Sequence, residues 1–316
     1  MKNWTLRDIP PQQGRLAVIT GATNGLGYET ALALAGADAE VVLTGRNAAK
    51  GEAALAKISA THPRANIRYA DLDLADLASV KAFADRFSGA HGALDLLVNN
   101  AGVMTPPTRH ATSDGFELQF GTNYLGHFAL TAHLLPLLRQ GRQARVVNLS
   151  SLAHRFRAAI HFDDLQWQRR YKPWQAYAQS KLAMLMFAFE LQRRSDTLRW
   201  GLMSNATHPG YATTGLQSAG PGLGRTAPSL AERIGKQIEP FTAQSAAAGA
   251  LPTLFAATSP DAKPAGYYGP RGFMELKGPV GEAIIGKAAQ DVAVAARLWD
   301  VSEHLAGVHW PRRAAS

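Results

Sequence analysis

The chain has 316 residues, a formal net charge of +9 and no cysteine. Its hydrophobic share of 46% is typical of a globular protein, and no apolar run reaches the ~18 residues of a membrane span, so we expect neither bulk disorder nor a spanning helix. The lack of cysteine excludes disulfide frameworks, thiolate metal sites and thiol nucleophiles. The positive charge alone fits a nucleic acid, an anionic lipid, a phosphorylated ligand or a solvated surface without a partner.

The first eight residues, Met1 to Asp8, show no apolar run after their charged residues. A secretory signal requires such a run. We therefore expect a cytoplasmic location.

Short apolar runs alternate with stretches of helical spacing over the first 210 residues. The runs predict strands at 16–20, 40–44, 67–70, 94–98, 145–149 and about 202–207. This alternation indicates βαβ units, and therefore an α/β fold with a doubly wound parallel sheet covered by helices on both faces.

A long helix is predicted over 173–196, with Pro173 in its first turn. Apolar residues cover most of its circumference, which indicates burial either in the interior or against another subunit. Residues 211–230 are rich in Gly, Ser, Thr and Pro, and form either a mobile lid or a plain surface loop. Helical patterns resume at 230–258 and 289–306, with a short last strand at 266–269 between them.

A glycine-rich turn lies between the first predicted strand and the first helix. It reads Thr20-Gly21-Ala22-Thr23-Asn24-Gly25-Leu26-Gly27. Glycines allow a tight turn and a close approach of the backbone to a pyrophosphate, which the helix N-terminus then holds. The position between strand and helix predicts a dinucleotide site, although the spacing differs from G-x-G-x-x-G.

The second predicted strand ends in Thr44-Gly45-Arg46-Asn47. At this position an acidic residue would bind the ribose 2′-hydroxyl of NAD, whereas an arginine accommodates the 2′-phosphate of NADP. Arg46 therefore favours NADP(H), unless it is only an exposed arginine at a helix start.

Two further strand ends carry candidate cofactor residues. Asn99-Asn100-Ala101-Gly102 follows the fourth strand and suits a close approach of the cofactor. Asp73-Leu74 follows the third strand and is a candidate for the adenine side.

Tyr177 and Lys181 are spaced i, i+4 within the long predicted helix, so they share one face. A tyrosine has a pKa of about 10, and a nearby lysine charge lowers it by stabilising the phenolate. The pair predicts acid–base chemistry, although such pairs also occur by chance.

Ser150 and Ser151 follow the fifth strand and reach the same edge of the sheet. A serine there can bind a substrate oxygen or simply form a turn. The surrounding sequence is not G-x-S-x-G, so a hydrolase nucleophile is unsupported, and we interpret His154 and His208 as structural or pocket-lining. No metal-ligand or nucleic-acid-reading motif occurs, so we expect no metal and no nucleic-acid partner.

Taken together and in order, these motifs resemble the short-chain dehydrogenase/reductase family over about residues 14–215. The resemblance implies a single Rossmann-type domain over 1–316 with about seven parallel strands. It also implies a catalytic tetrad of Asn123, Ser151, Tyr177 and Lys181. Tyr177 would be the general acid/base, Lys181 would hold the nicotinamide ribose, Ser151 would orient the substrate oxygen, and Asn123 would position a relay water.

The same resemblance implies which residues contact the cofactor. Besides Tyr177 and Lys181, these are Gly21, Thr23, Asn24, Gly25, Leu26, Gly27, Arg46, Asn47, Asp73, Leu74, Asn100, Ala101, Gly102, Pro209, Gly210 and Thr213. A homodimer or homotetramer without a membrane partner is also expected.

Residues 147–154 and 160–165 are similar to the branch of retinol dehydrogenases, WW-domain oxidoreductase and protochlorophyllide reductase. That branch carries an insert between serine and tyrosine, and here Ser151 and Tyr177 are 26 positions apart. We expect segments near 152–172 and 211–245 to cover the substrate.

The sequence thus predicts an NADP(H)-dependent oxidoreductase acting on a small carbonyl or alcohol substrate. The alternative is a non-catalytic NADP(H)-binding sensor or scaffold with the same fold.

Overall fold

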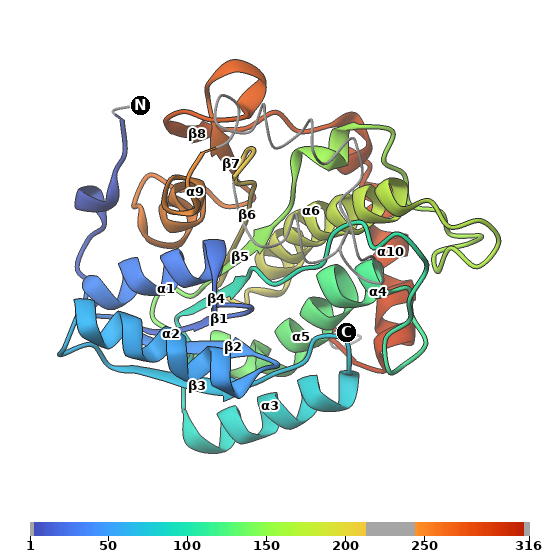
Figure 1. The fold of residues 1–316 in the computed structure, drawn as a ribbon. Helices are drawn as coiled ribbons and strands as arrows, with labels where there is room; N and C mark the ends of the chain where they lie inside the picture. The colour runs from blue at the N-terminus through green and yellow to red at the C-terminus, as the bar shows by residue number, and fades with distance from the viewer. Residues whose placement is uncertain (1–2, 213–243, 313–316) are drawn as a thin grey trace.

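The computed structural model of the chain describes residues 3–212 and 244–312. Its centre is one eight-stranded sheet with the strand order β3-β2-β1-β4-β5-β6-β7-β8 (Figure 1). The strands are β1 (Leu16–Ile19), β2 (Glu40–Gly45), β3 (Ile67–Asp71), β4 (Leu96–Asn99), β5 (Arg145–Leu149), β6 (Met203–Thr207), β7 (Tyr267–Pro270) and β8 (Val280–Glu282).

The first seven strands are parallel, as the sequence predicts, and β8 pairs with β7 in the antiparallel sense. The sequence analysis missed β8 because three residues at the edge of a sheet are too few to show a periodicity. The prediction of a doubly wound α/β fold is confirmed, with one strand more than expected.

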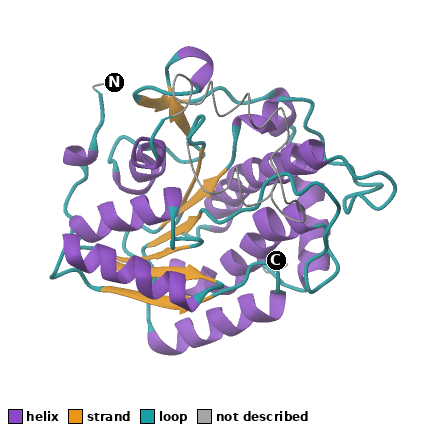
Figure 2. Ribbon diagram, viewed as in Figure 1, coloured by secondary structure: helices purple, strands orange, loops and turns teal. Residues whose placement is uncertain are grey.

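Helices cover both faces of the sheet (Figure 2). They are α1 (Gly25–Gly36), α2 (Ala48–Thr61), α3 (Leu77–Ala90), α4 (Leu118–Phe120), α5 (Gly126–Leu138), α6 (Pro173–Leu198), α9 (Ala246–Thr258) and α10 (Val292–Ala306). Shorter helical segments lie at Leu6–Asp8, Gly121–Leu125, Leu152–Arg155, Phe273–Glu275 and Lys287–Gln290.

Alternate residues of each strand enter different cores. Ala17 and Ile19 of β1 belong to the hydrophobic cluster beneath α1, α2 and α9. Val18, between them, belongs to the larger cluster beneath α3, α5, α6 and α10. Because successive side chains of a strand point to opposite faces, a fully apolar strand can fill both cores.

The long helix α6 is buried within its own chain. Phe187 packs against Trp299 of α10, with ring centroids 5.7 Å apart, and against Phe128 of α5, at 5.4 Å. Of the two interpretations of its apolar circumference, interior packing is therefore confirmed. This burial fixes the orientation of the Tyr177 and Lys181 face toward the carboxyl ends of the strands.

Candidate active site

The predicted dinucleotide turn connects β1 to α1. Gly21 and Gly25 have φ values of +63° and +56°, in the left-handed region that favours glycine. A Cβ on Gly27 would lie 2.6 Å from the Gly21 carbonyl oxygen, so the first helical turn must carry a glycine there to pack on the loop.

The N-terminus of α1 has the character of an anion site. Its N-cap residue, Asn24, is exposed and makes no capping hydrogen bond with its side chain, and the first turn contains no acidic residue. Backbone N–H groups at such a terminus, together with the positive end of the helix dipole, suit a phosphate.

The strand-end motif after β4 lies directly against this turn. The Asn100 side chain donates a hydrogen bond to the Thr20 carbonyl, at 2.7 Å. The Thr20 hydroxyl in turn accepts from the backbone N–H groups of Asn100 and Ala101, both at 2.9 Å. A Cβ on Gly21 would lie 2.8 Å from the Ala101 Cβ. The structure therefore joins the two predicted glycine motifs at the point between β1 and β4 where the strand order reverses, which is where open α/β sheets bind ligands.

The other residues expected near the adenosine lie around the end of β2. Arg46 is exposed just after β2, and the Thr23 side chain lies beside Gly45, with its methyl carbon 3.1 Å from where a Cβ would stand. Asn47 caps α2 by accepting from the Lys50 N–H at 2.9 Å.

Three predicted cofactor residues, Asp73, Leu74 and Leu26, make part of their contacts with other segments of the chain. The Asp73 carboxylate accepts from the Ala75 N–H at 2.9 Å, and buried Leu74 lies against Gly126 at the start of α5. Leu26 extends from α1 toward Gly249 of α9, where a Cβ would lie 2.8 Å from the leucine methyl carbon.

Ser151, Tyr177 and Lys181 converge despite the long spacing between the first two. Ser151 caps the short helix Leu152–Arg155, and its hydroxyl lies close enough to the Tyr177 phenol to oppose the rise in the phenol pKa. The Lys181 ammonium lies 5.9 Å from the centroid of the Tyr177 ring and donates to the Leu149 carbonyl at 3.0 Å. The insert therefore leaves the serine–tyrosine contact intact.

Asn123 stands beside this group in a π-helical segment, Gly121–Leu125. Its side-chain oxygen accepts from the Val103 N–H at 2.7 Å, and its amide donates to the Val103 carbonyl at 2.9 Å and to the Ser180 hydroxyl at 2.9 Å. A Cβ on Gly102 would be 3.1 Å from the Asn123 oxygen and 3.6 Å from the Lys181 nitrogen. The motif after β4 thus reaches both the nucleotide turn and the predicted tetrad.

Burial sets the protonation of the pair on α6. It raises the pKa of Tyr177 to about 12, against a smaller opposing effect of the Ser151 hydroxyl, and it lowers the pKa of Lys181 to about 8. The sequence analysis expected Lys181 to lower the tyrosine pKa. The structure differs because both groups are desolvated, which disfavours phenolate and ammonium alike.

The predicted cofactor segment after β6 is held against the turn that joins β7 to β8. Gly210 has a φ of +64°, and a Cβ there would lie 2.3 Å from the Leu276 carbonyl oxygen. The Pro209 carbonyl accepts from the Gln244 side chain at 2.6 Å. Thr213 and most of the predicted substrate segment 211–245 lie outside the described residues.

The other predicted substrate segment, 152–172, packs on α6 and on the region before α4. Gln179 of α6 donates to the Leu165 carbonyl at 3.0 Å, and the Gln166 side chain accepts from the Glu117 N–H at 2.7 Å. At its end, Trp174 is 48% exposed, with its ring centroid 6.0 Å from that of Tyr177. This position beside Tyr177 would allow Trp174 to line a substrate path.

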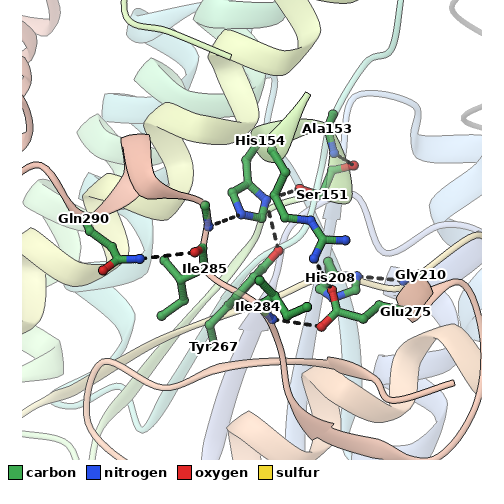
Figure 3. A network of polar contacts seen from close by, with 12 residues as sticks. Ser151, Ala153, His154, His208, Gly210, Tyr267, Glu275, Ile284, Ile285 and Gln290 are labelled. Atoms are coloured by element: carbon green, nitrogen blue, oxygen red, sulfur yellow. Dashed lines mark hydrogen bonds and ion pairs between the residues drawn. The ribbon is translucent and has the colours of Figure 1, made fainter. Parts of the chain in front are cut away.

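A polar network around Ser151 was not predicted as such (Figure 3). The buried ion pair Arg155–Glu275 spans 2.8 Å, and Glu275 also accepts from the Ile284 N–H at 2.8 Å. His208 lies 3.7 Å from the same carboxylate. These residues come from three distant segments, so their spacing in sequence carries no signal. Only the prediction that His154 and His208 are structural or pocket-lining pointed to this region.

The residues present fit a nicotinamide adenine dinucleotide cofactor. An uncapped helix N-terminus, an exposed arginine after β2 and a buried lysine beside the tyrosine supply donors and cations where phosphates and ribose hydroxyls need them. Over the ranges 3–212 and 244–312, no group of three or more His, Asp or Glu side chains is arranged to hold a metal ion.

Comparisons with known proteins agree with this geometry. The family model for short chain dehydrogenases matches residues 15–220. Mouse retinol dehydrogenase 12 is 39% identical over 94% of this chain and 88% of its own length. Mouse polyprenol dehydrogenase is 38% identical over 95% and 86%, and human retinol dehydrogenase 13 is 38% identical over 94% and 86%.

Solved structures show the same fold. An uncharacterized protein from Mycobacterium paratuberculosis has a TM-score of 0.80 and 38% identity, covering 98% of this chain and all of its own. A short chain dehydrogenase from Burkholderia cenocepacia, solved in complex with NADP, has a TM-score of 0.61 and 24% identity over 81% of this chain and 96% of its own. The latter likeness is one of fold.

The expectation of a cytoplasmic location is wrong. The retinol and polyprenol dehydrogenases that this chain is similar to are associated with membranes or the endoplasmic reticulum. The absence of a secretory pattern in the first eight residues therefore does not determine the compartment. Within the described ranges, none of the helices combines the length and hydropathy needed to cross a bilayer.

Proposed function

The chain belongs to the short-chain dehydrogenase family, in its retinol dehydrogenase-like branch, and from this premise we propose that it transfers hydride between NADP(H) and a carbonyl or secondary alcohol. The convergence of Ser151, Tyr177 and Lys181 beside the two glycine motifs carries the proposal. A protein that only bound a nucleotide would not need this acid–base group.

In the reducing direction, the reaction needs a proton on the carbonyl oxygen while hydride reaches the carbon. NADPH supplies the hydride when bound. Ser151 and Tyr177 contact each other, so one substrate oxygen can accept from both hydroxyls. Tyr177 then gives up its proton as general acid, and at neutral pH it is protonated, because its pKa is raised to about 12.

Lys181 supports the same step from its position near the Tyr177 ring. With a pKa of about 8, its amine is largely charged at neutral pH. A cation 5.9 Å from the ring centroid stabilises the phenolate that remains after proton transfer. The same ammonium group would hold the nicotinamide ribose.

The preference for NADP over NAD rests on the end of β2. Arg46 is exposed there, and the four residues 44–47 include no carboxylate to bind a ribose 2′-hydroxyl. The only acidic residue of β2, Glu40, is at its other end. A guanidinium forms fork-like hydrogen bonds with a 2′-phosphate.

The substrate class follows from similarity and from the site. The curated relatives are named for retinol and polyprenol, which are apolar alcohols. The half-exposed Trp174 near Tyr177 gives an apolar surface at the site. We therefore extend the candidates to apolar primary alcohols and their aldehydes, in addition to secondary alcohols and simple ketones.

The test is a reductase panel with NADPH and NADH, read by loss of the reduced-cofactor absorbance. We expect NADPH-dependent turnover, and Tyr177→Phe should lower kcat by about 100- to 10,000-fold, the range for a lost general acid. NADPH affinity of the variant should stay within about twofold, since the phenol contributes little to binding. Full activity of Tyr177→Phe would contradict the assignment. Tight NADPH binding without reduction of any ketone or aldehyde, and without oxidation of any alcohol when NADP+ is supplied, would instead favour the sensor alternative.

The remaining partner predictions stay predictions. They are a homodimer or homotetramer, and no nucleic-acid or membrane partner.

A further inference from the structure

Two buried histidine rings hydrogen-bond to backbone carbonyls of the predicted tetrad, one to Asn123 and one to Ser151. His127, in the first turn of α5, is fully buried, and His154, in the short helix after Ser151, is 1% exposed. The proposed chemistry uses neither ring. Burial lowers the pKa of His127 to about 3 and that of His154 to about 4, so both rings are neutral at physiological pH.

The contacts of His127 define its tautomer. Its Nδ1 lies 3.0 Å from the Asn123 carbonyl oxygen, which can only accept, so Nδ1 carries the proton. Its Nε2 then accepts from the Thr20 hydroxyl, at 2.8 Å. The competing acceptor for that hydroxyl, the Val98 carbonyl, is farther away, at 3.3 Å. Because the Thr20 oxygen accepts from the Asn100 and Ala101 N–H groups, one chain of hydrogen bonds links the nucleotide turn to the Asn123 backbone.

His154 makes a similar pair of hydrogen bonds near Ser151. Its Nδ1 lies 2.6 Å from the Ser151 carbonyl oxygen, and its Nε2 lies 3.1 Å from the Gly286 N–H, which can only donate. The ring is therefore also the Nδ1–H tautomer, with the Tyr267 hydroxyl 3.4 Å away as a weaker contact (Figure 3). His154 thus links the Ser151 backbone to the segment that follows β8.

We propose that His127 and His154 are positioning residues. His127 holds the backbone of Asn123 at a fixed distance from the nucleotide turn, and His154 holds the backbone of Ser151 at a fixed distance from the segment after β8. The inference rests on the proposed function. A neutral imidazole with its tautomer fixed at both nitrogens is a rigid spacer, and small displacements of catalytic groups are costly, a 1 Å error lowering a rate by about 100-fold.

His208 provides an internal contrast. Its Nδ1 accepts from the Gly210 N–H at 3.1 Å, so its proton is on Nε2, facing Glu275. The structure therefore predicts two buried rings of the Nδ1–H type and one of the Nε2–H type. Long-range ¹H–¹⁵N spectra of the ¹⁵N-histidine-labelled protein distinguish the two, and single His→Phe variants assign the signals.

The kinetic test uses three substitutions at each position. Phenylalanine removes both hydrogen bonds. Asparagine keeps a donor at the place of Nδ1, whereas glutamine places its polar group near Nε2. We expect His127→Phe and His154→Phe to lower kcat by about 10- to 100-fold, and the two Asn variants to recover most of it while the two Gln variants do not. His133→Asn, on the same helix as His127 but outside these contacts, should keep kcat within twofold.

Cofactor affinity separates the two histidines without turnover. His127→Phe should weaken NADPH binding, measured by fluorescence titration, because its chain reaches the nucleotide turn, and His154→Phe should not. If the wild-type protein has no turnover, the proposed function fails, yet the tautomers and this affinity split still test the pair.

Several results would contradict the proposal that His127 and His154 are positioning residues. They are Nε2–H signals for His127 or His154, folded Phe variants with unchanged kcat, and Asn variants no better than Gln variants of equal melting temperature. If a Phe variant does not fold, the kcat values of the Asn and Gln variants and the wild-type spectra test the positioning role instead.

Discussion

Arg46 is the residue on which the cofactor preference depends. It is exposed at the end of β2, where its guanidinium can move to a 2′-phosphate without losing a buried contact. A charge-assisted hydrogen bond contributes about 1.5–3 kcal/mol, so Arg46→Ala should weaken NADPH binding by about 10- to 100-fold. NADH binding should hardly change.

Fluorescence titration with both cofactors measures the effect of Arg46→Ala. Arg64→Ala, an exposed arginine in the loop after α2, is the matched control for the lost charge. Equal losses of affinity for NADPH and NADH would contradict the 2′-phosphate contact.

Lys181 contributes to function at the expense of stability. Its pKa is lowered to about 8 in the folded protein, so between pH 8 and 10 the unfolded chain binds more protons than the native state at this group. Stability due to Lys181 therefore rises with pH in this window, by about 2–3 kcal/mol. Lys181→Met should remove turnover. The unfolding free energy of the variant minus that of the wild type should be larger at pH 7–8 than at pH 10.

Urea denaturation of the two proteins at pH 7, 8, 9 and 10 measures this difference. Titrations of groups distant from Lys181 cancel in the comparison. A difference in unfolding free energy that does not change with pH would show that Lys181 keeps an ordinary pKa when folded.

At the scale of elements, the ion pair Arg155–Glu275 joins the segment after Ser151 to the turn between β7 and β8. Both side chains are largely buried, and Glu275 lies in the left-handed region with a φ of +58°. Removing the arginine leaves a buried carboxylate without its cation, which costs about 3–5 kcal/mol. Arg155→Met should therefore destabilise the protein by about this amount.

The double variant Arg155→Met, Glu275→Gln tests that explanation. It should recover part of the lost stability in chemical denaturation, since the uncompensated charge is gone. Additive losses would mean that the two side chains stabilise the fold independently.

These elements also show how far the sequence could predict the site. The glycine turn, the motif after β4, and Tyr177 with Lys181 were predicted because each follows a strand or shares a helix face, so local spacing fixes its position. The contact of Ser151 with Tyr177 was expected only by resemblance, and it depends on the insert packing against α6.

Other features depend on tertiary structure that spacing does not encode. The Arg155–Glu275 pair joins residues 120 positions apart, and the raised pKa of Tyr177 results from burial. Strand β8 is too short to show a pattern, and the five residues of the π-helical segment that contains Asn123 are too few to distinguish it from an α-helix in the sequence.

At the scale of the whole molecule, the C-terminal part completes the core. The family model ends at residue 220, yet β7, β8, α9 and α10 follow it. Trp310, after α10, is buried, with its ring centroid 4.5 Å from that of Trp299 and 5.7 Å from that of Trp200. Its backbone N–H donates to Glu303 at 2.9 Å.

This packing argues that the chain unfolds as a single domain, as the sequence analysis expects. Trp310→Ala removes a large side chain from the cluster and should destabilise the protein by about 3–5 kcal/mol, the usual cost of such a cavity. Val292→Ala, at the exposed start of α10, should change stability by less than about 0.5 kcal/mol. Urea unfolding is followed by tryptophan fluorescence and by far-UV circular dichroism. Coincident transitions that shift together in Trp310→Ala are expected for one cooperative unit. A first transition confined to the fluorescence of the C-terminal part, with the rest unfolding at the wild-type midpoint, would instead show that residues 244–312 unfold separately.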